Sequence, residues 1–160
     1  MYELKIITDF SAAHRLENFY GKCESLHGHN WKVEVLLLGE RLDEAGLIRD
    51  FGVVKAKARE VLAELDHKYL NDLPVFQEQN PSSENLARYL FERLSAALNN
   101  GGVRVSRVSV WESDTSCASY FESCCTHGTG RSGVFGLDAV VVPGRLGHGG
   151  PPHPAGRKLA

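Results

Sequence analysis

Two early segments of the chain alternate apolar and polar positions with a period of two, which is typical of half-buried β-strands. The first covers residues 2–10. The second runs from Trp31 to about Leu38, and Gly39 ends it. One face of this second segment is apolar and consists of Val33, Val35 and Leu37. We therefore predict two β-strands in the first part of the chain.

Two later segments have apolar residues three or four positions apart, as on the buried face of an amphipathic helix. The first helix is expected to begin after a cap at Asp50 and to run to about Leu65. The second is expected to begin after a cap at Ser82 or Ser83 and to stop at Gly101. The predicted inward positions are Val54, Ala58, Val61, Leu62 and Leu65 in the first helix and Leu86, Leu90, Leu94 and Leu98 in the second.

Two further strands are expected at residues 103–112 and 117–121, so the predicted order is β-β-α-α-β-β. Strand pairs on either side of a helical pair indicate an α+β fold, with an antiparallel sheet and both helices on one of its faces. The composition changes near residue 123, after which glycine, proline and arginine become frequent. We therefore expect one domain at 1–122 and a mostly flexible extension at 123–160.

The charge balance argues against nucleic acid and membrane surfaces as partners. The chain has 18 lysines and arginines against 20 aspartates and glutamates, whereas proteins that bind polyanions are usually basic. No apolar run approaches the ~20 residues of a membrane span, and the first ten residues lack the basic and apolar regions of a signal peptide. We expect a soluble, cytoplasmic protein. Its cysteines are then expected to stay reduced, and they are Cys23, Cys117, Cys124 and Cys125.

Three histidines lie next to the first two predicted strands. His14 follows the first strand, and His27 and His29 lead into the second. Residues i and i+2 of an extended segment point to the same side, so His27 and His29 can present both imidazoles to one point. His14 can join them if the strands are neighbours; otherwise these are solvated loop histidines. Three neutral imidazoles suit zinc and leave a fourth position for water or substrate, the pattern of a catalytic site.

Cys23 lies four residues before His27, and its spacing is compatible with two roles. Beside a zinc ion the pKa of its thiol falls, and the thiolate can take a proton. As a fourth ligand, Cys23 would instead close a structural site of one cysteine and three histidines. The spacing alone leaves both roles open.

Two further places carry residues suited to proton transfer or ligand binding. Asp66 and His67 are expected at the end of the first helix, where they can shuttle protons or form a simple helix-end cap. Glu112 closes the third predicted strand. Its carboxylate can accept two parallel N–H donors from a heterocycle with a guanidine-like edge, or it is an ordinary surface glutamate.

Taken together, these residues resemble the 6-pyruvoyltetrahydropterin synthase / 6-carboxy-5,6,7,8-tetrahydropterin synthase family. The resemblance covers roughly residues 3–121 and keeps the family's order of motifs. These motifs are FSAAHRL, CESLHGHNW, IRDFGVVK, LDHKYLND, NPSSENLA and VWES. The resemblance implies the tunnelling fold, in which the sheets of several subunits join into a barrel. It also implies a homohexamer of two trimers, with active sites at subunit boundaries.

The resemblance further implies a role for each site residue. Three residues match the family's zinc ligands: His14, His27 and His29. Cys23 matches the cysteine that abstracts a proton, and Asp66 and His67 match its Asp–His relay. Glu112 matches the glutamate that anchors the pterin.

The implied substrate is 7,8-dihydroneopterin triphosphate, and family members differ in their product. The cysteine spacing favours the group that makes 6-carboxy-5,6,7,8-tetrahydropterin towards queuosine, with release of acetaldehyde and triphosphate. A second group makes the pyruvoyl compound. A third group cleaves the side chain to 6-hydroxymethyl-7,8-dihydropterin and carries a glutamate in the spacing ExxHGH. Alternatives to all three are another enzyme on this fold and a non-enzymatic zinc module closed by Cys23.

One detail of this sequence combines two of these groups. Glu24 follows Cys23, so that CExxHGH contains both the cysteine spacing and the glutamate spacing. This combination resembles members that serve both the queuosine and the folate routes. Glu24 is thus a candidate second base; its alternative is a surface acid without a role.

Overall fold

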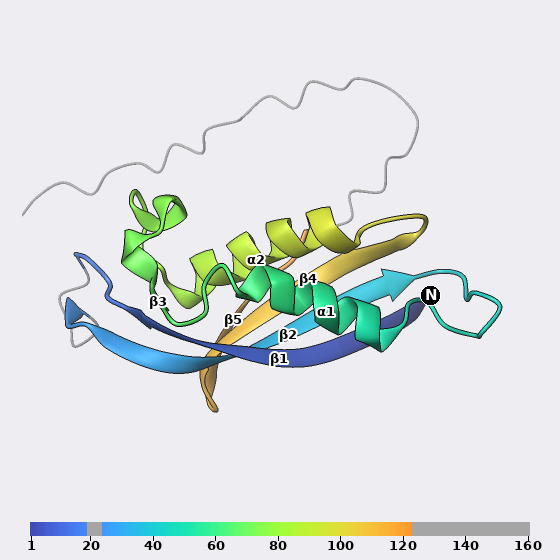
Figure 1. Ribbon diagram of the computed structural model, residues 1–160, viewed down its shortest axis with the longest axis horizontal. Helices are drawn as coiled ribbons and strands as arrows, with labels where there is room; N and C mark the ends of the chain where they lie inside the picture. The colour runs from blue at the N-terminus through green and yellow to red at the C-terminus, as the bar shows by residue number, and fades with distance from the viewer. Residues whose placement is uncertain (19–23, 123–160) are drawn as a thin grey trace, which may run out of the picture. The chain divides into compact units, whose positions relative to one another are not determined.

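The computed structural model describes residues 1–18 and 24–122, so the predicted extension 123–160 lies outside the described residues. The described part is a five-stranded sheet in the order β3-β1-β2-β4-β5, with two helices over one face (Figure 1). The strands are β1 (Tyr2–His14), β2 (His27–Gly39), β3 (Lys68–Tyr69), β4 (Val103–Ser113) and β5 (Ser116–Tyr120). The helices are α1 (Phe51–Leu62) and α2 (Ser83–Leu98), and two 3-10 turns, η2 (Leu70–Asp72) and η3 (Pro74–Phe76), precede α2. The predicted α+β fold is confirmed.

The sheet is mixed rather than antiparallel as predicted. The pairs β1–β2, β2–β4 and β4–β5 are antiparallel, whereas β3 lies parallel to β1 at Ala12 and Ala13. A strand of two residues is too short to show a periodicity, so the sequence pattern could not reveal β3. Its position at the edge of β1 brings residues 66–69 next to the end of that strand.

β1 and β2 are longer than predicted at the ends that face each other. Both contain 13 residues, and their pairing continues to the last pair, His14 with His27. The buried positions of β1 continue through Ala12 to His14, whose exposed fraction is 1%. Alanine and histidine are not strong strand formers, so pairing with β2 extends β1 where residue preference does not. The three histidines therefore lie within the sheet and not in loops beside it.

The core lies between the sheet and the two helices. All the predicted inward positions of the helices and of β2 are buried. Asp50 and Ser82 cap the helices as predicted, by accepting hydrogen bonds from the N–H groups of Val53 and Asn85. The helices contain 12 and 16 residues, and no helix in the described part of the chain is long and apolar enough to cross a membrane.

α1 ends at Leu62, so the prediction that it runs to Leu65 and carries Asp66 and His67 at its end is wrong. The N–H of Leu65 bonds to the carbonyl of Leu62, three residues back, which shows the tighter turns that follow the helix. His67 has a φ of 55°, outside the helical region. Leu65 is nevertheless fully buried. The apolar stripe therefore continues past the helix, which is why the pattern overestimated its length.

The core position Leu90 provides a test of this packing. Leu90 of α2 is fully buried, and replacing it with alanine removes apolar contacts and leaves a cavity. We expect Leu90→Ala to lower the free energy of unfolding by about 2–5 kcal/mol in urea denaturation. Leu42, which is 43% exposed, is the control, and Leu42→Ala should change stability by less than about 0.5 kcal/mol. Equal effects at the two positions would contradict this arrangement of the core.

Candidate metal centre

The three histidines converge because of the register of the β1–β2 pair. His14 lies opposite His27, and Ala12 lies opposite His29. His27 and His29 share the face of β2 that also carries the buried Trp31, which is the face covered by the helices. The imidazole centroids are 4.5 Å apart for His14 and His27, 5.3 Å for His14 and His29, and 4.9 Å for His27 and His29. The structure therefore brings all three predicted ligands together.

Backbone carbonyls orient two of the three imidazoles. Nδ1 of His14 lies 2.8 Å from the carbonyl oxygen of Pro81, and Nδ1 of His27 lies 2.7 Å from that of Ser25. A carbonyl only accepts, so Nδ1 carries the proton in both rings and Nε2 keeps its lone pair. Nε2 of His14 and Nε2 of His29 are buried and have no hydrogen-bond partner within the described residues. Buried lone pairs left open in this way fit metal ligands.

Glu112, at the end of β4, completes a group of four potential ligands. The ligand atoms of His14, His27, His29 and Glu112 all lie within 4.8 Å of one another. Oε1 of Glu112 is 3.0 Å from Nε2 of His29, in an arrangement that does not form a hydrogen bond. Its other oxygen, Oε2, accepts a hydrogen bond of 3.3 Å from the hydroxyl of Ser83 at the start of α2. This donor set of imidazoles and a carboxylate can hold a divalent metal ion.

Burial favours the neutral form of the imidazoles of His14 and His29. The pKa of His14 lies below its ordinary value because burial disfavours the charged form, and the bond to Pro81 offsets this only in part. Burial likewise lowers the pKa of His29, although the charge of Glu112 acts in the opposite direction. Metal ligation requires neutral imidazole, so this environment prepares both rings to bind a metal near neutral pH.

A cavity of about 530 Å³ adjoins His14 and Glu112. Its walls come from the start of α2 and from the first residues of β5, and they include Ser82, Ser83 and Cys117. Its size is in the range of small-molecule sites. In the sequence, Ser82 and Ser83 are recognisable only as possible helix caps, and Cys117 has no recognisable role. The approach of the two serines to Glu112 depends on how α2 packs on β4, which no sequence spacing indicates.

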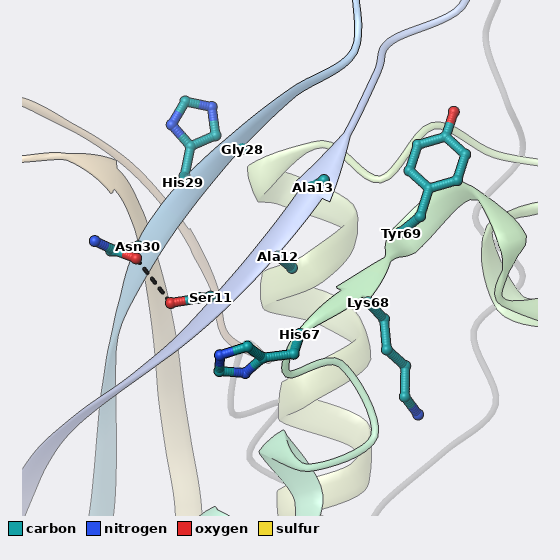
Figure 2. A pocket seen from close by; sticks show the side chains of 9 residues that line it. All are labelled: Ser11, Ala12, Ala13, Gly28, His29, Asn30, His67, Lys68 and Tyr69. Carbon is teal, nitrogen blue, oxygen red and sulfur yellow. Dashed lines mark hydrogen bonds between the residues drawn. The ribbon is translucent and has the colours of Figure 1, made fainter.

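Asp66 and His67 lie outside the histidine group. Oδ1 of Asp66 accepts a hydrogen bond of 2.9 Å from the N–H of Ser11 and lies 3.0 Å from Nδ1 of His67. These two donors, the N–H of Ser11 first, lower the pKa of Asp66. The side chain of His67 is 82% exposed. It lines a second cavity of about 550 Å³, whose walls come from β1, β2 and residues 67–69 and include His29, and Figure 2 shows it beside Ser11.

The two remaining candidates lie at the end of the gap in the described chain, with Cys23 inside it and Glu24 directly after it. Cys23 lies outside the described residues, so its position relative to the histidines stays a prediction. Glu24 is exposed and lines a shallow hollow with Arg15, Glu17 and Asn18.

Comparison with known proteins assigns the chain to a family. The family model described as 6-pyruvoyl tetrahydropterin synthase matches residues 3–123. This chain belongs to the 6-pyruvoyl tetrahydropterin synthase family. It is 38% identical over 117 residues to a 6-carboxy-5,6,7,8-tetrahydropterin synthase from Synechocystis, covering 70% of this chain and 87% of that protein. Both the carboxypterin and the pyruvoyl names therefore occur among its relatives.

Two further members of the family are informative. A dihydroneopterin monophosphate aldolase from Pyrococcus furiosus is 37% identical over 103 residues, which are 64% of this chain and 82% of that protein. The solved structure of Caenorhabditis elegans 6-pyruvoyl tetrahydropterin synthase superimposes with a TM-score of 0.69 at 31% identity, covering 76% of this chain and 96% of that one. The family and its fold, recognised from the sequence motifs, are confirmed.

The lowered pKa values predict how stability depends on pH. The unfolded chain has ordinary histidines, with a pKa near 6.5, and binds protons before the buried His14 and His29 do. We expect the metal-free protein to keep its full stability above about pH 6.5 and to lose it as the pH falls below that value. The pKa values of Asp66 and Glu64 are lowered too, but carboxyl groups contribute to this loss at lower pH.

Urea unfolding in the presence of a chelator, at several pH values between about 8 and 5, measures this dependence. His14→Gln removes one of the buried imidazoles and should make the dependence shallower. Stability that rises on acidification, or an unchanged slope in the variant, would contradict the prediction.

Proposed function

We propose that this protein converts 7,8-dihydroneopterin triphosphate to 6-carboxy-5,6,7,8-tetrahydropterin, with release of acetaldehyde and triphosphate. The observation that carries this proposal is the convergence of three imidazoles beside a cavity that also contains Glu112. The relative from Synechocystis has the name of this activity, and formation of the pyruvoyl compound is the alternative suggested by other relatives. We assign the reaction to residues 1–122 and place it in the cytoplasm, in the route to queuosine.

His14, His27 and His29 would hold zinc. The open Nε2 lone pairs and the lowered pKa values of His14 and His29 support this role, and the imidazole of His27 lies beside both rings. Zinc bound there would supply a Lewis acid for the hydroxyl groups of the substrate side chain.

Glu112 would anchor the pterin ring. An ionised carboxylate accepts two parallel N–H bonds from the guanidine-like edge of a pterin. The Ser83 hydroxyl, bonded to Oε2, orients this carboxylate from α2. Substrate bound to Glu112 would fill the adjacent cavity of about 530 Å³ and place its side chain towards the histidines.

Cys23 and the Asp66–His67 pair would transfer protons. The Cys23 thiolate would take a proton from the substrate side chain, and His67 would return or accept one while Asp66 holds its tautomer. Asp66 and His67 are not part of the histidine group of their own chain. We therefore assign them to the site of a neighbouring subunit, in a hexamer of two trimers whose open sheets join into a barrel.

Product analysis of the zinc-loaded protein with 7,8-dihydroneopterin triphosphate tests this function, and we expect carboxypterin and acetaldehyde. Cys23→Ala should retain zinc and lower the rate by the ~10²–10⁴-fold of a lost acid–base group. His27→Ala should lose zinc and activity together, because two imidazoles hold the ion weakly.

Three results would contradict parts of this assignment. A pyruvoyl product would support the alternative reaction. Loss of zinc from Cys23→Ala would support a structural site with Cys23 as fourth ligand. Full activity and unchanged metal content in His27→Ala would refute the three-histidine centre.

A second activity, formation of 6-hydroxymethyl-7,8-dihydropterin, is supported by the relative that is named an aldolase. Glu24 directly follows Cys23, so two bases can serve one bound side chain. The Glu24 carboxylate would assist side-chain cleavage from within hydrogen-bond reach of the proton, or through one water. Adjacent residues of an extended strand face opposite ways, so this assignment requires an irregular backbone at the two residues.

Separate substitutions of the two bases test the second activity. We expect Glu24→Ala to lose the hydroxymethyl product and to keep carboxypterin formation, and Cys23→Ala to do the reverse. Both products are measured from the same reaction by chromatography. Absence of the hydroxymethyl product with the wild-type protein would leave carboxypterin formation as the single activity.

A further inference from the structure

One edge of β1 is bonded to a single stretch of the chain, residues 66–80. At Ser11, the N–H donates to Oδ1 of Asp66, and the carbonyl accepts a bond of 2.6 Å from the N–H of His67. Two residues further along, β3 pairs with Ala13 (Figure 2). Alternate residues of a strand direct their N–H and C=O groups to the same edge. Ser11 and Ala13 begin a series of alternate residues that bond at this edge. The next two residues of the series, Arg15 and Glu17, lie beyond the end of β1.

Two asparagine side chains continue the series past β1. Asn71 accepts from the N–H of Arg15 through Oδ1 and donates to its carbonyl through Nδ2, both at 3.0 Å. Asn80 binds Glu17 in the same way, with distances of 2.8 and 2.9 Å. A side-chain amide has one acceptor and one donor group side by side, so each asparagine replaces a residue of a neighbouring strand. The series ends at Asn18, where φ is 61°.

The segment that carries Asn80 also contacts two of the proposed site groups. The carbonyl of Pro81 binds Nδ1 of His14, and the hydroxyl of Ser83 binds Glu112. Residues 80–83, at the start of α2, therefore bind the proposed metal ligand His14 and the proposed pterin anchor Glu112. They also bind Glu17, in the chain that follows His14.

We propose that Asn71 and Asn80 are positioning residues for the reaction. They bind the backbone just beyond His14 and thereby fix the start of the connection that carries Cys23 and Glu24. This inference rests on the proposed function for the role of these two bases, whereas the hydrogen bonds themselves do not depend on it.

The expected effect on catalysis is larger than the effect on stability. Each asparagine and the residue that it binds form a clamp of two hydrogen bonds at the surface, and the loss of one clamp leaves the domain folded. Misplacement of a catalytic group by about 1 Å can lower a rate by ~10²-fold. Loosening the chain between the metal ligand and the base thus affects the chemical step more than the fold.

Steady-state kinetics of three zinc-loaded variants test the role in catalysis. We expect Asn80→Ala and Asn71→Ala to lower kcat by about 10–10²-fold with zinc content unchanged. KM should stay unchanged in Asn71→Ala, whereas Asn80 also lines the cavity that the substrate would fill. Asn100→Ala is the matched control, because it also removes an asparagine that bonds across the chain, to Arg49, but beyond the far end of α2. The control should keep the wild-type kcat.

Amide hydrogen exchange tests the clamps without reference to activity. In Asn80→Ala and Asn71→Ala, we expect residues 15–18 to exchange up to about tenfold faster, and α2 and β4 to exchange as in the wild type. Unchanged exchange at residues 15–18, faster exchange throughout the domain, or unchanged kcat despite faster local exchange would each overturn the inference. A wild-type protein that forms no pterin product would refute the proposed function instead, and exchange would then decide alone whether the asparagines hold this segment.

Discussion

The register between β1 and β2 is the constraint on which the candidate site depends. It places His14 opposite His27. His29 lies two residues further along β2, with its side chain on the same face. A slip of one residue would move the imidazoles to opposite faces and would also expose Trp31 and the valines of β2. Burial of the core therefore specifies the register, and the register assembles the metal centre.

The start of α2 is the second element that shapes the site. The carbonyl of Pro81 selects the tautomer of His14, and the hydroxyl of Ser83 binds the carboxylate of Glu112. The cap at Ser82 fixes where the helix begins and so where these groups lie. One helix terminus thus couples the ligand on β1 to the carboxylate on β4, across the interior of the domain.

One chain does not bring all the residues of the proposed reaction together in one group. The Asp66–His67 pair is bonded to Ser11 at the edge of β1, away from the group formed by His14, His27, His29 and Glu112. Among the described residues, the sheet is open at both sides, and strands with unpaired edges readily pair with other chains. The separation of the proposed proton-transferring pair from the candidate metal centre supports the proposal that sites are shared between subunits.

The sequence by itself determined the order of the two helices and the four longer strands, the family, and the three histidines that the structure brings together, because strand and helix periodicities, the motifs and the HxH spacing are local properties of the chain. Only the tertiary structure decided that α1 stops at Leu62, that β3 pairs with β1 and that Asn71 and Asn80 clamp the chain beyond His14. The last two features depend on hydrogen bonds between residues more than 50 positions apart, which no local pattern of the sequence encodes. The open lone pair of His14 likewise follows from packing, since the carbonyl of Pro81, 67 positions away, orients the ring and burial removes water from it.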